Sequence, residues 1–172
     1  YGHPSEKLED GQTFLSDLGI LFGQILSGIE GNVPGEFHEK NLSGQEVVNE
    51  LQQRLGSYFS GINVNVKLAD GIISDASAGA DYIKIKNGPL FSKRDVDIFE
   101  VHEGWVHLGT TINGQRQTYA QWLSKGPPCS TVTQEGLAVL MEVFNFAIYP
   151  ERAKRLNNRL KACQMAEDGA NL

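Results

Sequence analysis

Apolar residues in the first sixty positions recur at three- and four-residue steps, which places them on one face of a helix. Residues 10–29 follow this pattern, and Gly19 and Gly23 lie four apart on one side, which indicates close packing against another helix. The pattern returns over residues 44–59, where Ser43 precedes Glu46 in the spacing of a capping box. We therefore expect two amphipathic helices here.

Alternation by two replaces the helical period in the next segment. In residues 62–68 every second residue is apolar and the others are polar, which is typical of a half-buried strand. Residues 71–79 are rich in Gly, Ala and Ser, so we expect a turn and a short, irregular strand. Residues 82–86 predict another short strand, which Asn87, Gly88 and Pro89 end.

Helical patterns return in the second half of the chain. Ser92 can cap a helix that ends near residues 113–114. Thr131 and Gln134 have the spacing of a capping box for a helix from residue 132 to about residue 149.

Pro150 opens a last, basic helix that we expect to reach about residue 165. Together these elements predict an α+β fold in which helices pack around a small mixed sheet. The 172 residues are enough for one domain with a core of its own. Because the chain begins at Tyr1, we interpret it as one domain, residues 1–172, from a longer protein.

Composition narrows the class of protein. With 15 basic and 21 acidic residues, the net charge of −6 argues against a nucleic-acid partner, which a basic patch would mark. No apolar run reaches the length of a membrane span, so we expect no membrane partner either. Cys129 and Cys163 are too few for a disulfide framework and indicate free thiols in a reducing, cytoplasmic compartment. The oligomeric state stays open.

The segment from His102 to His107 carries the chemistry. Zinc peptidases use a HExxH pattern, in which two His on one helix face bind the metal and the Glu takes a proton from the metal's water. Here Glu103 follows His102, but the second His lies five residues on rather than four. In a regular α-helix this spacing leaves the two imidazoles about 140° apart.

A π-type turn would return both imidazoles to a common face. Such turns are rare and concentrate at functional sites. Gly104 relaxes the backbone within the segment. We therefore predict a local widening between His102 and His107. The alternative is a chance pair of His on a regular helix.

A third ligand is needed, because catalytic zinc takes three protein ligands and keeps one position open. His3 and His38 lie in predicted loops near the start. Glu135 stands in the first turn of the next long helix, as the third ligand does in thermolysin-like enzymes. Its alternative role is to interact with the helix dipole. Glu142 is either a partner of a ligand His or a solvated surface residue.

Four motifs carry a resemblance to a known family. They are residues 100–107 (EVHEGWVH), 109–114 (GTTxNG), 126–128 (GPP) and 133–138 (TQEGLA). These segments resemble the bacterial QEGLA-motif proteins, a family of unknown function often labelled flavohemoglobin-expression-modulating. That family is similar to the microtubule-associated tyrosine carboxypeptidases, which remove the C-terminal tyrosine of α-tubulin.

The resemblance implies a zincin-like fold and a metallocarboxypeptidase activity on a peptide or protein C-terminus. It implies Zn²⁺ held by His102, His107 and Glu135, with Glu103 as the base. The eukaryotic relatives carry Gly-Thr before the second His, where this chain has Trp105 and Val106. Tubulin specificity therefore does not transfer. We interpret Trp105 as core packing.

Residues that contact the substrate are less well marked. The strand of residues 82–86 could be an edge that pairs with an extended peptide or an ordinary edge kept soluble by its lysines. An oxyanion donor is needed, and the candidates are Thr110, Tyr119 and Tyr82. A substrate carboxylate could meet Arg116, Lys84 or Lys86, or groups beyond Leu172.

Two other classes of function compete with the peptidase. In the first, the chain is a regulatory or protein-interaction module whose metal site is structural or lost. The intact Glu103 argues against it, because a structural zinc takes four protein ligands and needs no base. In the second, the chain is a helical interaction domain that binds no metal, and its helix is regular through Gly104.

Overall fold

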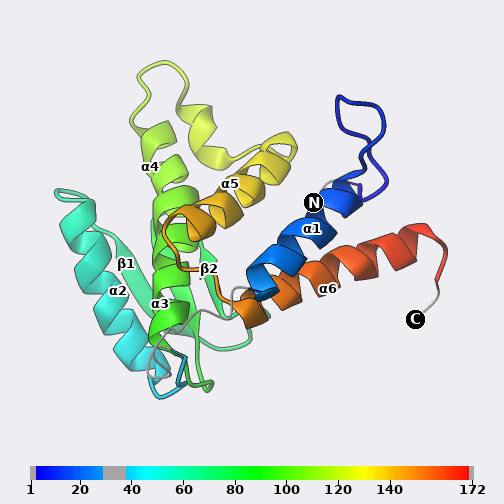
Figure 1. The fold of residues 1–172 in the computed structure, drawn as a ribbon. Coiled ribbons are helices and arrows are strands. Elements are labelled where there is room, and N and C mark those ends of the chain that lie inside the picture. The colour runs from blue at the N-terminus through cyan, green and yellow to red at the C-terminus, as the bar shows by residue number, and fades with distance from the viewer. Residues whose placement is uncertain (1–2, 29–37, 171–172) are drawn as a thin grey trace. The chain divides into compact units, whose positions relative to one another are not determined.

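The computed structural model describes residues 3–28 and 38–170. Its contacts divide the chain into two compact units, Tyr1–Val33 with Ile148–Leu172, and Pro34–Ala147. The second unit contains a small mixed sheet flanked by helices, so the expected α+β class is confirmed (Figure 1). In the described part of the chain, no helix combines the length and the hydrophobicity that crossing a membrane requires.

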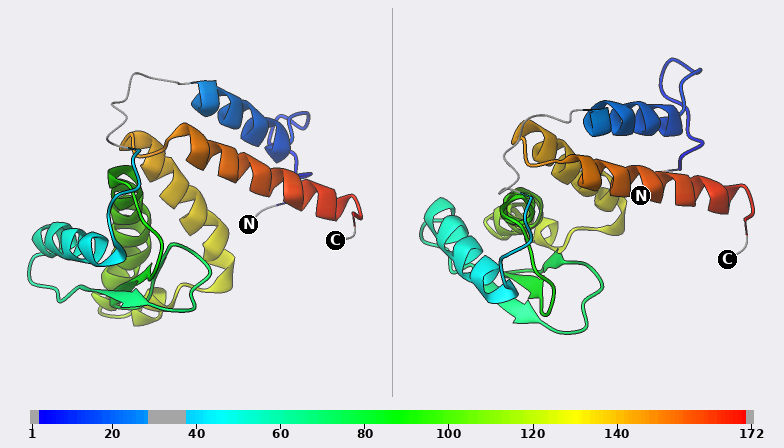
Figure 2. Two further views of the ribbon diagram at one scale, coloured as in Figure 1. Left: turned by 90° about the horizontal axis from the view of Figure 1, so that it is seen from below. Right: turned by 60° about the horizontal axis from the view of Figure 1, so that its bottom comes forward.

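The first unit is built on two helices that lie side by side, α1 (Leu15–Gly28) and α6 (Pro150–Glu167) (Figure 2). A Cβ atom on Gly19 would lie 2.2 Å from Leu160, and one on Gly23 would lie 3.2 Å from Asn157. The two glycines therefore let the helices approach closely, as the sequence predicts.

The first helix begins later than predicted. Asp10 accepts hydrogen bonds from the backbone amides of Gln12 and Thr13 and from the Thr13 hydroxyl. These bonds hold residues 10–13 in a turn instead of a helix, and they lower the pKa of Asp10. The predicted end of this helix at Ile29 lies outside the described residues.

The sheet of the second unit has three strands, β1 (Asn65–Ala69), β2 (Ala76–Ala78) and β3 (Tyr82–Lys86). Their order is β1-β3-β2, with β3 parallel to β1 and antiparallel to β2. The bounds of β3 are those predicted, whereas β1 begins three residues late. The prediction that β3 is an edge is wrong, because β3 pairs on both sides and β1 and β2 form the edges.

One face of the sheet is apolar and buried. Ile83 and Ile85 of β3 are fully buried beside Val66 of β1. Because side chains alternate along a strand, Tyr82 and Lys84 stand on the opposite face.

Helix α2 (Gly44–Tyr58) packs on the sheet and contributes the fully buried side chains of Leu51 and Leu55. It begins at Ser43 with the expected capping box. The Gln52 side chain ties it to β1, donating to the carbonyl of Val64 and accepting from the amide of Val66.

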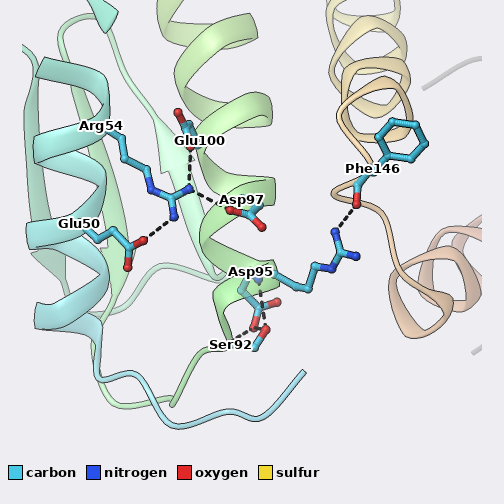
Figure 3. Close-up of polar contacts among 8 residues, drawn as sticks. Glu50, Arg54, Ser92, Asp95, Asp97, Glu100 and Phe146 are labelled. Carbon is cyan, nitrogen blue, oxygen red and sulfur yellow. Dashed lines mark hydrogen bonds and ion pairs between the residues drawn. The ribbon is translucent and has the colours of Figure 1, made fainter. Parts of the chain in front are cut away.

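A continuous helical rod, residues 93–115, crosses the second unit beside α2 (Figure 1). We call it the central helix. It consists of α3 (Lys93–Phe99), the π-helix η2 (Glu100–Leu108) and α4 (Gly109–Gln115). Ser92 caps its start, and the buried Asp95 completes a capping box (Figure 3). The sequence predicts both this cap and the approximate end.

Two short 3₁₀ turns, η3 (Gln121–Lys125) and η4 (Pro128–Ser130), lead to α5 (Thr131–Phe144). The predicted capping box at Thr131 is wrong, because Thr131 already lies inside the helix and Ser130 is its N-cap. The helix also ends five residues before the predicted Tyr149. Phe146 adopts a left-handed conformation with φ 54°, and Arg94 of the central helix binds its carbonyl (Figure 3).

The capping box of α2 predicts a pH-dependent stability. The Ser43 hydroxyl and amide donate to Glu46, and these bonds lower the pKa of Glu46 below its ordinary value of 4.5. Their contribution is therefore present above pH 4.5 and is lost as the pH falls through the lowered pKa. We expect Glu46→Gln to be less stable than wild type at pH 7 and equally stable in acid, measured by urea unfolding. Glu39→Gln, at an exposed residue outside the helices, is the control. A gap that does not change with pH would contradict this assignment.

Candidate metal centre

The central helix is wide where the sequence predicts widening. Residues 100–108 are π-helical, and the amide of Gly109 donates to the carbonyl of Gly104, five residues back. At this spacing His102 and His107 lie on one face, with ring centroids 4.9 Å apart. The predicted π-type widening is confirmed, and the alternative of a regular helix through Gly104 is wrong.

Glu135 of α5 lies opposite the two imidazoles. Its carboxylate oxygens are 3.6 Å from Nε2 of His102 and 3.5 Å from Nε2 of His107. One ligand atom from each of these three residues lies within 4.8 Å of the other two. Among the described residues, this group has the side chains and the spacing that could hold a metal ion. The structure therefore brings together the three predicted ligands.

The spacing of these atoms fits a bound zinc ion. Hydrogen bonds from nitrogen to oxygen span about 2.7–3.2 Å, so both contacts to Glu135 are longer than good hydrogen bonds. Bonds of about 2.0–2.2 Å to a tetrahedral zinc place two nitrogen or oxygen ligands about 3.4 Å apart. Two imidazoles and one carboxylate are also a donor set of catalytic zinc sites.

The other ring nitrogens are held by α5. Nδ1 of His102 lies 2.7 Å from Oε1 of Glu142, which is fully buried. Glu142 is thus the hydrogen-bond partner of a predicted ligand, and its alternative role as a surface residue is wrong. Nδ1 of His107 lies 3.4 Å from Oε1 of Gln134. Both rings therefore present Nε2 to the common centre, and the short contact with Glu142 orients His102 as outer partners orient metal ligands.

Sequence reasoning missed Gln134, because its position three residues after Thr131 suggested a helix cap. The available signal was its place beside Glu135. On α5, Gln134, Glu135, Ala138 and Glu142 form one stripe toward the central helix, and its last two members are buried.

Glu103 points to a different neighbour, the sheet. Its Oε2 accepts a hydrogen bond of 2.8 Å from the backbone amide of Ala78 in β2. Glu103 follows His102 in the chain and is only partly buried. The predicted base therefore contacts β2 through its carboxylate.

The weaker candidates for substrate contact are spread over the sheet, α4 and the segment that follows α4. Tyr82 and Lys84 are on the outer sheet face, where the ammonium groups of Lys67 and Lys84 lie 4.4 and 5.3 Å from the Tyr82 ring centroid. Thr110 is half-buried in α4. In the next segment Arg116 is exposed, and Tyr119 is 98% exposed. Among the described residues, none of these five makes a hydrogen bond, ion pair or ring contact with His102, His107 or Glu135.

Two further candidates from the sequence, His3 and Trp105, make contacts of their own. His3 lies 3.0 Å from Glu167 within the first unit, far along the chain from the other histidines. Trp105 stacks on Tyr58 of α2, with ring centroids 5.2 Å apart, so it packs against a neighbouring helix, but it is only partly buried and lies outside the buried core where the sequence places it.

Comparison with known proteins identifies the family. The whole chain, residues 1–172, matches the family described as microtubule-associated tyrosine carboxypeptidase. The chain belongs to this family. The resemblance carried by the four sequence motifs is thereby confirmed. Searches of curated proteins and of solved structures gave no match.

The buried bond between Glu142 and His102 generates a prediction for metal affinity. Glu142→Gln keeps the shape of the side chain but removes the charge that orients and polarises His102. We expect the affinity for zinc to fall about 10- to 100-fold, measured by competition with a chromophoric chelator. Glu151→Gln, at an exposed residue of α6, should bind zinc as wild type does. Equal affinities in the two variants would exclude the proposed role.

Proposed function

We propose that this protein is a zinc-dependent peptidase of the carboxypeptidase type. The observation that carries the proposal is the convergence of His102, His107 and Glu135 through a π-helical turn. A regular helix would not produce it. Membership in a family named for carboxypeptidase activity supports the same reaction. A zincin-like arrangement is part of the proposal.

In this proposal His102 and His107 hold the zinc through Nε2, and Glu135 holds it through its carboxylate. When bound there, zinc would lower the pKa of a water molecule and polarise a peptide carbonyl. Glu142 and Gln134 keep the imidazoles in the ligating orientation.

Glu103 acts as the general base. It takes a proton from the attacking water and passes it to the nitrogen of the departing amine. The amide of Ala78 holds one of its carboxylate oxygens, which limits the carboxylate's rotation. The other oxygen remains for the water. A non-catalytic metal module would give Glu103 no such task.

The edge strand β2 is the proposed site for the substrate backbone, in place of β3. Backbone hydrogen bonds join Gly79 to Tyr82 and Lys86 to Asp75 where β2 pairs with β3. Antiparallel pairing alternates, so the polar groups of Ala76 and Ala78 point away from β3. The bond from Ala78 to Glu103 follows this rule. A peptide added at this edge would therefore run beside the proposed base.

The proposed substrate is the C-terminus of a peptide or protein. Residues that recognise it remain to be assigned among Tyr82, Lys84, Thr110, Arg116 and Tyr119. The proposed compartment is the cytoplasm, in keeping with two free, exposed thiols.

The function is tested by measuring metal content and hydrolysis together. We expect wild type and Glu103→Gln to bind about one zinc each and His107→Ala to bind none, measured by elemental analysis. Wild type should release amino acids from a mixture of synthetic peptides, followed by mass spectrometry. Glu103→Gln should do so about 10²- to 10⁴-fold more slowly because it lacks the base.

Each outcome separates the competing functions. A zinc-loaded wild type that cleaves no peptide would support a regulatory metal module. A wild type that binds no zinc after reconstitution would exclude the metal centre altogether and favour an interaction domain. Equal hydrolysis by wild type and Glu103→Gln would remove Glu103 from the mechanism.

The type of peptidase is tested with paired substrates. A carboxypeptidase recognises the terminal carboxylate, which amidation converts into a neutral group. We expect amidated peptides to be cleaved much more slowly than the same peptides with free termini, with products one residue shorter. Equal rates, or cleavage at internal bonds, would indicate an endopeptidase.

A further inference from the structure

Two helices of different pitch lie side by side in the second unit. Helix α2 is a regular α-helix, in which residues four apart share a face. The π-helical part of the central helix brings residues five apart to one face, as the bond from Gly109 to Gly104 records. Where the two helices contact each other, residues four apart on α2 must therefore face residues five apart on the π-helical part of the central helix.

The contacts show this match. Leu55 of α2 lies against Gly104, where an added Cβ atom would approach it to 2.5 Å. Phe59, which caps α2 and is four residues further on, lies against Gly109, with 3.6 Å to such an atom. Gly104 and Gly109 are five apart, the same spacing as His102 and His107.

In a regular α-helix the two glycines would point about 140° apart. Only one of them could then face α2. The paired contacts of Leu55 and Phe59 are thus compatible with the wide turn and incompatible with an α-helical one. Leu55 is fully buried and has little room to move.

Arg54 fixes the beginning of the same segment. Its guanidinium donates to Asp97 and to Glu100, the first residue of the π-helix, at 2.8 Å each, and also to Glu50 of α2 (Figure 3). Burial alone would lower the pKa of Arg54, but the hydrogen bonds to three carboxylates raise it above its ordinary value. The cation therefore stays charged and holds the helix two residues before His102.

We propose that α2 is the template that holds the central helix in its π register, and so sets the metal ligands. Arg54, Leu55 and Phe59 contact it along its length on α2's side, whereas α5 holds the imidazoles. These three are positioning residues and do not contact the metal centre. The proposal rests on the metal centre of the proposed function, but the register itself can be measured without metal.

Two substitutions of the same kind test it. Gly104→Ala and Gly109→Ala each add one methyl group and raise α-helix propensity equally. Only the methyl at residue 104 meets α2 too closely, at 2.5 Å from Leu55, whereas that at residue 109 makes ordinary contact. We expect Gly104→Ala to weaken zinc binding about tenfold or more and Gly109→Ala to bind like wild type. The double variant Leu55→Ala with Gly104→Ala should recover affinity, because the space is restored.

Two further measurements distinguish register from general stability. In the metal-free chain, NMR couplings across hydrogen bonds should link the residue 109 amide to the residue 104 carbonyl in wild type and in Gly109→Ala. In Gly104→Ala that coupling should be lost. Thermal unfolding should show that Gly104→Ala remains folded, and the double variant should regain the coupling even if its melting temperature falls.

The outcomes separate this proposal from the proposed function. If wild type binds zinc and Gly104→Ala keeps both the coupling and the affinity, α2 does not set the register. If the two single variants lose affinity equally, helix propensity is responsible and the template is excluded. A wild type that binds no zinc but shows this pattern of couplings would overturn the metal centre while supporting the template.

Discussion

The five-residue spacing between His102 and His107 is the constraint on which the site depends. An α-helix would direct the two imidazoles apart, so the two can bind one metal ion only in a wider turn. Nine residues, Glu100–Leu108, take up the π form. Such turns are rare because the hydrogen-bond geometry and the packing inside the helix are poorer than in the α form. The surrounding structure must therefore stabilise the turn.

Three neighbours share that task. On one side α2 supplies the Arg54 ion pairs and the close contact of Leu55 with Gly104. On a second side α5 supplies Glu142 and Glu135, and on a third β2 binds Glu103 through a backbone amide. The fully buried carboxylate of Glu142 is tolerated because it is hydrogen-bonded to His102. His102 and His107 thus have partners on α5, whereas the partner of Glu103 is on β2, so these contacts form only when the second unit folds.

Predictions from local sequence patterns were wrong where a contact with a distant part of the chain decided the structure. Gln134 has the spacing of a helix cap, yet its amide lies beside His107. The strand of residues 82–86 has the alternation of an edge strand, yet it pairs on both sides. The apolar pattern of α5 continues in the sequence to Tyr149, but the helix ends at Phe144. Shortly after this end, Arg94 donates a hydrogen bond to the carbonyl of Phe146. In each case a contact from a distant part of the chain decided the outcome, and local periodicity carries no record of such contacts.

The sequence by itself determined the local features. It determined the capping box at Ser43, the cap at Ser92 and the bounds of β3, because these depend on neighbours within a few positions. The α+β class followed from the order of the elements, and Glu135 was singled out by its place on the next helix and by the family resemblance. A common face for His102 and His107 required a π turn, whereas a chance pair of His on a regular helix was the alternative. The tertiary structure decided what fixes that turn and where the ligands point, namely α2 on one side and Glu142 and Gln134 on the other. Those partners lie 27 to 50 positions away in the chain, and only packing brings them together.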